Sequence, residues 1–469
     1  MIEAFQNLFK IPDLRKRIIF TFLLLAVYRV GAQIPTPGIN ALALSEFFKQ
    51  YQQGVLGFIN LFSGGALARC TIFALGIMPY ITAQIIFQLL AVVWPYIEKL
   101  QKEGGAEGRK KITQYTRYLT ILICIVQSLG ISFWVKGLVS PGSGMRVVAN
   151  PTLGYHITTV IILTAGATFV MWLGEQITAR GVGNGISLMI YAGIVVGLVP
   201  AIFKTIQKLQ QGSISFFVVL LLVAFMAAVV AFIVYFEKAE RKIPIQYAKR
   251  MVGRKMMGGQ AVYFPLKLNP GGVMPIIFAV SLLAVPQTLF GLPALAKYHF
   301  ITVLKAYFGY GTLTYLGVYG LLILLFTYFY VSIVFNPEDL ADNLKKFGGF
   351  IPGIRPGKST SNFLYRSLNR LLFAGSIYLV LVALLPVMLI SGFPLQHLWN
   401  VGPTIETVFK SLHLDWILRG FNLNFYFGGT SLLIVVGVAM DTIQQVESQL
   451  VMRHYDGFSS RTRFRGRRR

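Results

Sequence analysis

Ten apolar runs, separated by short polar or basic stretches, dominate the pattern of the sequence. Each run approaches the length that an α-helix needs to cross a bilayer, about 17–25 residues. The runs cover residues 18–34, 71–94, 118–135, 157–173, 186–203, 216–236, 273–290, 313–335, 371–390 and 426–443. The pattern therefore predicts an all-α polytopic membrane protein with ten transmembrane helices.

The stretch before the second run is unusual. Residues Phe58 to Cys70 form a short apolar piece that is interrupted by Ser63-Gly64-Gly65, and a full-length run follows it. Irregular backbone at membrane depth is tolerated only where protein buries it or where it lines a wet cavity. Interrupted apolar segments point to a binding or translocation site in transport proteins. A re-entrant loop with a purely structural role is the alternative that the pattern leaves open.

Five of the runs precede residues 204–215 and five follow them. An odd number of spans in each half inverts the second half relative to the first, as in several transport folds. We therefore expect an N-terminal half (1–203), an outer hinge loop (204–215), a C-terminal half (216–443) and a basic cytoplasmic tail (444–469).

Composition supports a membrane protein and excludes an ordinary soluble enzyme. The chain is 55% hydrophobic and 13% charged, and its mean hydropathy is +0.64. Its two cysteines, Cys70 and Cys124, lie in apolar surroundings and suggest neither a metal site nor a disulfide framework. The basic N-terminus leads into Ile18–Val27 without a small-residue cleavage site, so we expect no cleavable signal peptide.

The net charge of +26 is distributed unevenly. If the ten runs span, 32 of the 43 Lys and Arg residues fall on the side that carries both termini. The positive-inside rule makes that side cytoplasmic. The sequence thus predicts a multi-pass protein of the plasma (inner) membrane with both termini in the cytoplasm.

Two cytoplasmic loops, residues 237–272 and 336–370, mix basic residues with apolar and turn-forming ones. Basic loops with exposed apolar residues suit large, acidic or RNA-bearing partners. The alternative is a solvated basic loop that only sets topology. The tail RTRFRGRRR could bind anionic lipid or RNA.

The sequence offers no catalytic constellation. All 17 acidic residues fall in loops or near the ends of runs, and the nearest to a membrane interior are Glu175 and Asp441. No Ser-His-Asp, HExxH or P-loop spacing occurs. A small-solute transporter would need a charged group near the midplane, and an intramembrane hydrolase would need a reactive pair within the spans. We expect no enzyme activity, no cofactor and no metal.

Five longer stretches resemble one family. They read NLFSGGALARCTIFALGIMPYITAQIIFQLL, EQITARGVGNGIS, YAKRMVGRKMMGG with the following PLKLNPGGVMPIIFA, NLKKFGGFIPGIRPG, and FYFGGTSLLIVVGVAMD. Together they resemble the SecY family, whose members form the central subunit of the bacterial protein-conducting channel. The resemblance extends from Asn60 to Asp441. The outer connection Ser391–Asn424 is longer than the family pattern implies.

The resemblance implies an hourglass pore between two inverted five-helix halves, with a ring of aliphatic residues at its waist. The matching positions are Ile81, Ile85, Ile190, Ile277 and Ile434. Such a ring grips a moving chain of any sequence through non-specific dispersion contacts, and it stays dry when empty. Core packing or lipid contact is the ordinary alternative for any one isoleucine.

The resemblance also implies a plug, a short half-helix within Leu61–Thr71 that seals the ring from outside. Its residues are Leu61, Phe62, Ser63, Gly64, Gly65, Ala66 and Leu67. A lateral gate is expected between the second and third spans and the seventh and eighth. We further expect Pro79 and Pro275 to weaken two of these helices from inside.

By the same resemblance, the chain passes unfolded polypeptides across the plasma membrane and releases transmembrane segments sideways into lipid. Signal sequences and unfolded chains are its substrates, and anionic lipids surround it. The SecA ATPase or a ribosome, through rRNA, is expected to dock on the cytoplasmic loops, and SecE and SecG are expected membrane partners. The docking residues are Lys249, Arg250, Arg254, Lys255, Lys345, Lys346 and Arg355.

Overall fold

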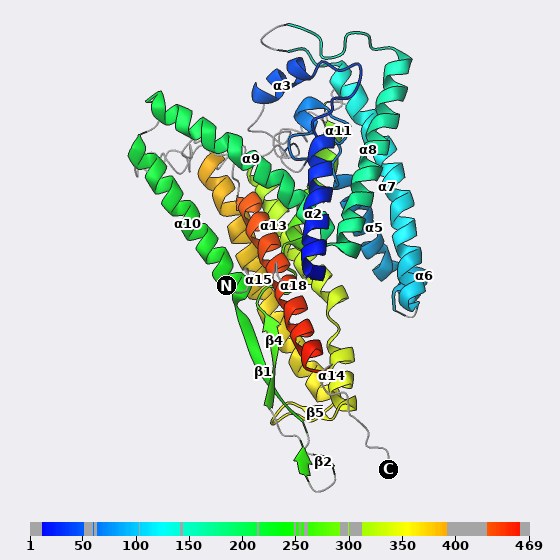
Figure 1. Cartoon of the computed structure of the whole chain (residues 1–469), viewed down its shortest axis with the longest axis vertical. Coiled ribbons are helices and arrows are strands. Elements are labelled where there is room, and N and C mark those ends of the chain that lie inside the picture. The colour runs from blue at the N-terminus through cyan, green and yellow to red at the C-terminus, as the bar shows by residue number, and fades with distance from the viewer. Residues whose placement is uncertain are drawn as a thin grey trace. The chain divides into compact units, whose positions relative to one another are not determined.

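The computed structural model describes most of the chain as helices, which Figure 1 labels along the sequence. The described residues are 12–50, 60, 63–102, 104–140, 144–212, 215–247, 250–252, 255–257, 261–290, 299, 312–391 and 429–459. The helices are α2 (Pro12–Gly31), α3 (Ala41–Gln50), α5 (Met78–Val93), α6 (Pro95–Lys102), α7 (Gly105–Lys136), α8 (Leu153–Arg180), α9 (Gly185–Gln210), α10 (Phe216–Lys238), α11 (Met274–Phe290), α13 (Leu313–Val334), α14 (Pro337–Lys346), α15 (Lys358–Ser391) and α18 (Gly429–Ser459). A 3₁₀ turn, η1, spans Leu67–Arg69.

The chain divides into two compact units. The first contains Met1–Gln207, Ser281–Tyr310 and Val438–Arg469, and the second contains Lys208–Val280 and Gly311–Gly437. In the first unit, α5 packs against α7, and α7 packs against α8. In the second, α13 packs against α15.

Each of the ten predicted spans contains a helix. Among the described residues, six helices are long and apolar enough to cross a membrane, and the pair α5–α6 would add a seventh although it bends by 105°. The helix α11 is shorter, α2 carries charged residues at both ends, and α18 carries them from Asp441 onward. Ten helices thus occupy the predicted positions.

The second span begins later than the sequence predicts. Residues 71–77 form turns, and α5 starts at Met78 with Pro79 in its first turn. Pro275 is likewise the second residue of α11. Proline is favoured at the start of a helix, where no intrahelical partner for its missing N–H exists. The expectation that these two prolines weaken helix interiors was therefore wrong.

Two other boundaries differ from expectation. The helix α9 continues to Gln210, so most of the predicted loop 204–215 is helical. The helix α18 continues to Ser459, well beyond the predicted end of the tenth span. Both extensions are polar, and the apolar pattern marks only the part of a helix that lies in a membrane.

The first of the two loops predicted to be cytoplasmic contains strands, which the all-α prediction did not include. The strand β1 (Glu240–Tyr247) follows α10 and pairs antiparallel with β4 (Ala261–Lys267), while β2 (Arg250–Val252) pairs with β3 (Lys255–Met257) (Figure 1). In β1, Ile243 and Ile245 are buried and their neighbours are largely exposed. This alternation is typical of a strand with one buried face.

The two loops predicted to be cytoplasmic form one structure. The strand β5 (Gly349–Phe350), from the second loop, pairs with the end of β1. An apolar cluster joins Ile243 and Leu266 of the hairpin to Ile351 and Leu364 of the second loop and α15. The helix α14 between them is capped by Asn336, whose side chain accepts a hydrogen bond from the Glu338 N–H at 3.1 Å.

Candidate channel site

The predicted plug is a tight turn followed by η1. Gly64 and Gly65 both adopt left-handed backbone angles, with φ of 65° and 85°. The Ser63 hydroxyl donates to the Asn60 carbonyl at 2.9 Å and accepts from the Leu67 N–H at 3.2 Å. Leu61 and Phe62 lie outside the described residues. In the part that is described, the expected half-helix is only the 3₁₀ turn, because the two glycines favour a turn rather than a helix.

Two side chains of α2 donate hydrogen bonds to backbone carbonyls of this turn. The Tyr28 hydroxyl donates to the Ser63 carbonyl at 3.3 Å, and Arg29 Nη1 donates to the Gly64 carbonyl at 3.0 Å. Further along, both the N–H and the hydroxyl of Thr36 donate to the Cys70 carbonyl. These partners are about 35 residues apart in sequence, and sequence reasoning missed them.

The same turn touches α9. A Cβ placed on Gly64 would lie 3.0 Å from the Cα of Gly193. Gly193 is three residues from Ile190, so both lie on one side of the helix, one turn apart. The plug backbone therefore contacts the helix that carries a predicted ring residue.

All five predicted ring residues are buried, with at most 2% of each exposed. In the first unit, Ile81 and Ile85 lie four residues apart on one face of α5, and Ile190 lies on α9. In the second unit, Ile277 lies on α11 and Ile434 on α18. Burial alone is equally compatible with core packing, so the ring stays a prediction.

One polar contact joins α5 to α11 within the first unit. The Ser281 hydroxyl donates to Met78 Sδ at 3.8 Å. These two helices occupy the second and seventh predicted spans. The expected lateral gate opens only if these two spans move apart. The contact is long and weak, as sulfur is a weak acceptor.

The predicted docking residues lie on both cytoplasmic loops. Arg355 is exposed in the turn before α15, and its carbonyl accepts a hydrogen bond from the Thr360 hydroxyl at 3.0 Å. Lys345 and Lys346 are exposed in the last turn of α14. Arg250 begins β2 and Lys255 begins β3, while Lys249 and Arg254 lie outside the described residues. The pairing of β5 with β1 brings the two loops together, which the sequence did not predict.

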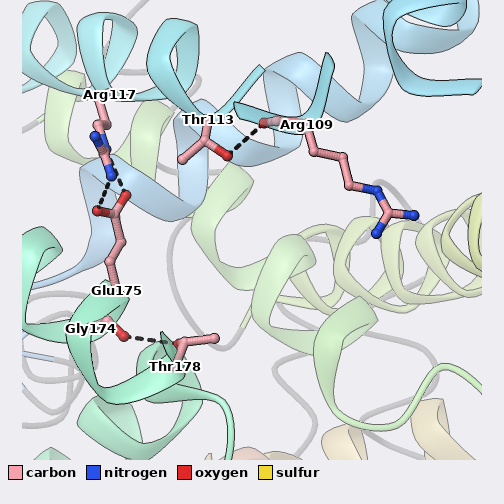
Figure 2. A network of polar contacts seen from close by, with 6 residues as sticks. All are labelled: Arg109, Thr113, Arg117, Gly174, Glu175 and Thr178. Carbon is pink, nitrogen blue, oxygen red and sulfur yellow. Dashed lines mark hydrogen bonds and ion pairs between the residues drawn. The ribbon is translucent and has the colours of Figure 1, made fainter. Parts of the chain in front are cut away.

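Sequence reasoning also missed an ion pair between α7 and α8. Arg117 Nε and Nη2 donate to the two oxygens of Glu175 at 3.0 and 2.7 Å, as Figure 2 shows. The signal was present in part, because Glu175 is one of the two acidic residues nearest a span interior. The sequence alone did not indicate that Arg117 is its partner, because 58 residues separate the two. Within the described part of the chain, no three His, Cys, Asp or Glu residues gather as metal ligands would.

The corner between α8 and α9 explains the motif EQITARGVGNGIS. The Thr178 hydroxyl donates to the Gly174 carbonyl and accepts from the Gly185 N–H, both at 2.9 Å. Asn184 caps α9, since its side-chain oxygen accepts from the Ile186 N–H at 3.1 Å. A Cβ on Gly185 would lie 2.0 Å from the Gly174 carbonyl oxygen, so only glycine fits there.

Comparison with known proteins gives one consistent result. The family model for SecY matches residues 71–443. The protein translocase subunit SecY of Aquifex aeolicus is 43% identical over 461 residues, which cover 98% of this chain and all of that protein. A solved structure described as a protein conducting channel has a TM-score of 0.62 at 18% identity, covering 93% of this chain and 92% of the other.

A second similar structure is Sec61 in a canine ribosome–channel complex from the endoplasmic reticulum. Its TM-score is 0.59 at 18% identity, and the match covers 93% of this chain and 92% of that one. At this identity the solved structures establish the fold, and the close relative establishes the family. The chain therefore belongs to the SecY family of protein translocase subunits.

Proposed function

We propose that this protein-conducting channel moves unfolded polypeptides out of the cytoplasm across the plasma membrane through a ring of Ile81, Ile85, Ile190, Ile277 and Ile434. The ring grips a passing chain without reading its sequence, and it excludes water when the channel is idle. The chain performs no catalysis itself. It also releases sufficiently apolar segments sideways, because burial in lipid favours them.

The contact between the Gly64 turn and α9 is the observation that carries this proposal. A plug must reach the constriction that it seals, and Gly64 lies against Gly193, one turn from Ile190. The bonds from Tyr28, Arg29 and Thr36 to the plug stretch all end on its backbone carbonyls. A plug held in this way can leave its seat without unfolding the helices that surround it.

The partners follow from the basic cytoplasmic loops. Their basic residues suit an acidic surface or rRNA, so we assign them to docking of the SecA ATPase or a ribosome. The canine channel of similar fold occurs in a complex with a ribosome. SecE and SecG are the membrane partners of the chain, and the lopsided distribution of Lys and Arg puts both termini in the cytoplasm.

Asparagine substitution tests the ring. Ile190→Asn places a hydrogen-bonding group where the idle pore must stay dry, so we expect water to enter and idle ion conductance to rise. The matched control is Ile202→Asn on the same helix, where the side chain is 55% exposed. Single-channel conductance and the yield of folded protein are measured for both variants.

A pore ring and a packed core give different results for Ile190→Asn. If Ile190 only packs in a core, its Asn variant loses about 1–3 kcal/mol of stability through a buried, unpaired amide and gains no conductance. Crosslinking supplies an independent measurement: cysteines at Ile81, Ile190 and Ile434 should each capture a stalled translocating chain. Absence of crosslinks at all three, with correctly inserted protein, would exclude the ring.

A further inference from the structure

The Arg117–Glu175 ion pair lies at the ends of two predicted spans, one residue before the third and two residues after the fourth. Arg117 is on α7 and Glu175 on α8, both within helices that are apolar enough to span a membrane. The Glu175 side chain is only 15% exposed, and that of Arg117 is 47% exposed. Two parallel N–H···O bonds hold the pair side-on (Figure 2), the geometry that makes Arg–carboxylate pairs strong and directional.

A third side chain connects this pair to α5. Tyr80 is buried on α5 and lies near both Glu175 and Arg117. It immediately precedes Ile81, the first of the two ring residues on α5. The ion pair and its aromatic neighbour therefore join three helices, α5, α7 and α8, at the level where α5 begins.

The residue before Glu175 brings α8 close to two ring-bearing helices. A Cβ on Gly174 would lie 3.6 Å from Ile77 Cδ1, at the start of α5, and 3.4 Å from Met189 Sδ, on α9. Met189 is the neighbour of Ile190. The hydrogen bonds of Thr178 to Gly174 and Gly185 fix the turn from α8 into α9. The corner thus positions the beginnings of both α5 and α9.

We propose that the Arg117–Glu175 ion pair is a positioning element of the pore. It fixes the corner of α5, α8 and α9 and thereby holds Ile81, Ile85 and Ile190 in the closed ring. This inference rests on the proposed role of these isoleucines. Arg117 and Glu175 touch no substrate in this account; they act through the helices that carry the ring.

Removing one charge should loosen the corner. In Glu175→Gln, Arg117 keeps its charge but loses the carboxylate that holds it side-on, so the charge-assisted bonds that tie α7 to α8 are lost. We expect idle ion conductance to rise about tenfold, a coupling of ordinary size between two sites in one protein. The swapped variant Arg117→Glu with Glu175→Arg restores the attraction and should lower conductance again.

A matched control lies on α7 itself. Lys111 and Glu107 form an exposed pair at 3.8 Å, four residues apart on the helix. Exposed pairs of this kind contribute little, so Glu107→Gln should leave idle conductance unchanged. Thermal unfolding of each variant separates a positioning role from a merely structural one, because loss of a structural contact lowers the unfolding temperature without opening the pore.

The outcomes separate the two proposals. Idle conductance that rises in Glu175→Gln and falls again in the swap supports the positioning role. If idle conductance rises in Ile190→Asn but not in Glu175→Gln, the ring is correct and the positioning role is wrong. If idle conductance rises in neither variant, both proposals are wrong. A leak that the swap fails to reduce also contradicts the pair's role. Should Glu175→Gln fail to fold, Arg117→Lys, which keeps the charge but loses the side-on geometry, must leak more than Glu107→Gln.

Discussion

Two adjacent glycines show how single residues shape the plug. Gly64 and Gly65 both have left-handed backbone angles, which cost other L-residues roughly 1–2 kcal/mol. Their surroundings differ. A Cβ on Gly64 would meet Arg29 Nη1 at 2.7 Å and the Cα of Gly193 at 3.0 Å, whereas a Cβ on Gly65 would meet nothing within 4 Å. At position 64, both the backbone angle and the neighbouring atoms therefore favour glycine. At position 65, only the backbone angle does.

We predict that Gly64→Ala unseats the plug and that Gly65→Ala does so much less. The methyl group at position 64 must displace the backbone of α9 or break the bond from Arg29, so idle conductance should rise. At position 65 only the backbone strain acts. Single-channel recording of both variants at equal folded yield makes the comparison, and equal conductance would show that the contact with Gly193 does not seat the plug.

Local pattern in the sequence singled out the glycine pair. The resemblance to the SecY family supplied the five isoleucines, of which only Ile81 and Ile85 share a helical spacing. Tyr28, Arg29, Arg117 and Glu175 could not be singled out, because their partners are 35 to 58 residues away. Which polar groups meet depends on how helices pack, and no short-range pattern carries that information.

At the scale of elements, helix starts are fixed by specific caps. Asn184 accepts hydrogen bonds from the N–H groups of Ile186 and Ser187 at 3.1 and 3.5 Å, so its side chain caps the first turn of α9. Ser215, at the start of α10, makes no such bond. A side-chain cap therefore stabilises the start of α9 and not that of α10.

We predict that Asn184→Ala destabilises the first turn of α9 by about 1 kcal/mol, the usual contribution of an N-cap. Amide hydrogen exchange at Ile186 and Ser187 should accelerate about fivefold, since that free energy corresponds to such a factor. Ser215→Ala is the control and should leave exchange at the start of α10 unchanged. Equal effects of the two substitutions would contradict the role of the Asn184 side chain.

Element positions were predictable and element ends were not. Apolar runs located all ten helices, because burial in lipid requires about 20 apolar residues together. The helix α5 starts late because Pro79 is favoured in the first turn of a helix and not in its interior. The β1–β4 hairpin was missed because its basic residues dominated the composition of the loop, although Ile243 and Ile245 alternate as a strand requires.

At the scale of the whole molecule, the distribution of charge predicts the orientation of the chain in the membrane. The predicted cytoplasmic side holds 32 of the 43 Lys and Arg residues, so no single charge decides topology. The loops 237–272 and 336–370 carry 14 of these 32 charges and are folded together, through β5 pairing with β1 and the apolar cluster around Ile243. If this surface also serves docking, a single charge in it matters for binding rather than for topology.

We predict that Arg250→Glu and Arg355→Glu leave insertion and orientation intact but weaken binding of the ATPase or the ribosome. Reversing a charge in a docking contact costs about 2–5 kcal/mol, which raises Kd by roughly 30-fold or more. Arg146→Glu is the control, because this exposed arginine lies in a loop on the predicted outer side. Binding is measured on channels whose orientation protease protection has confirmed. If both variants bind as well as the unchanged channel, these arginines serve topology alone, and docking must rely on the other residues of the two loops.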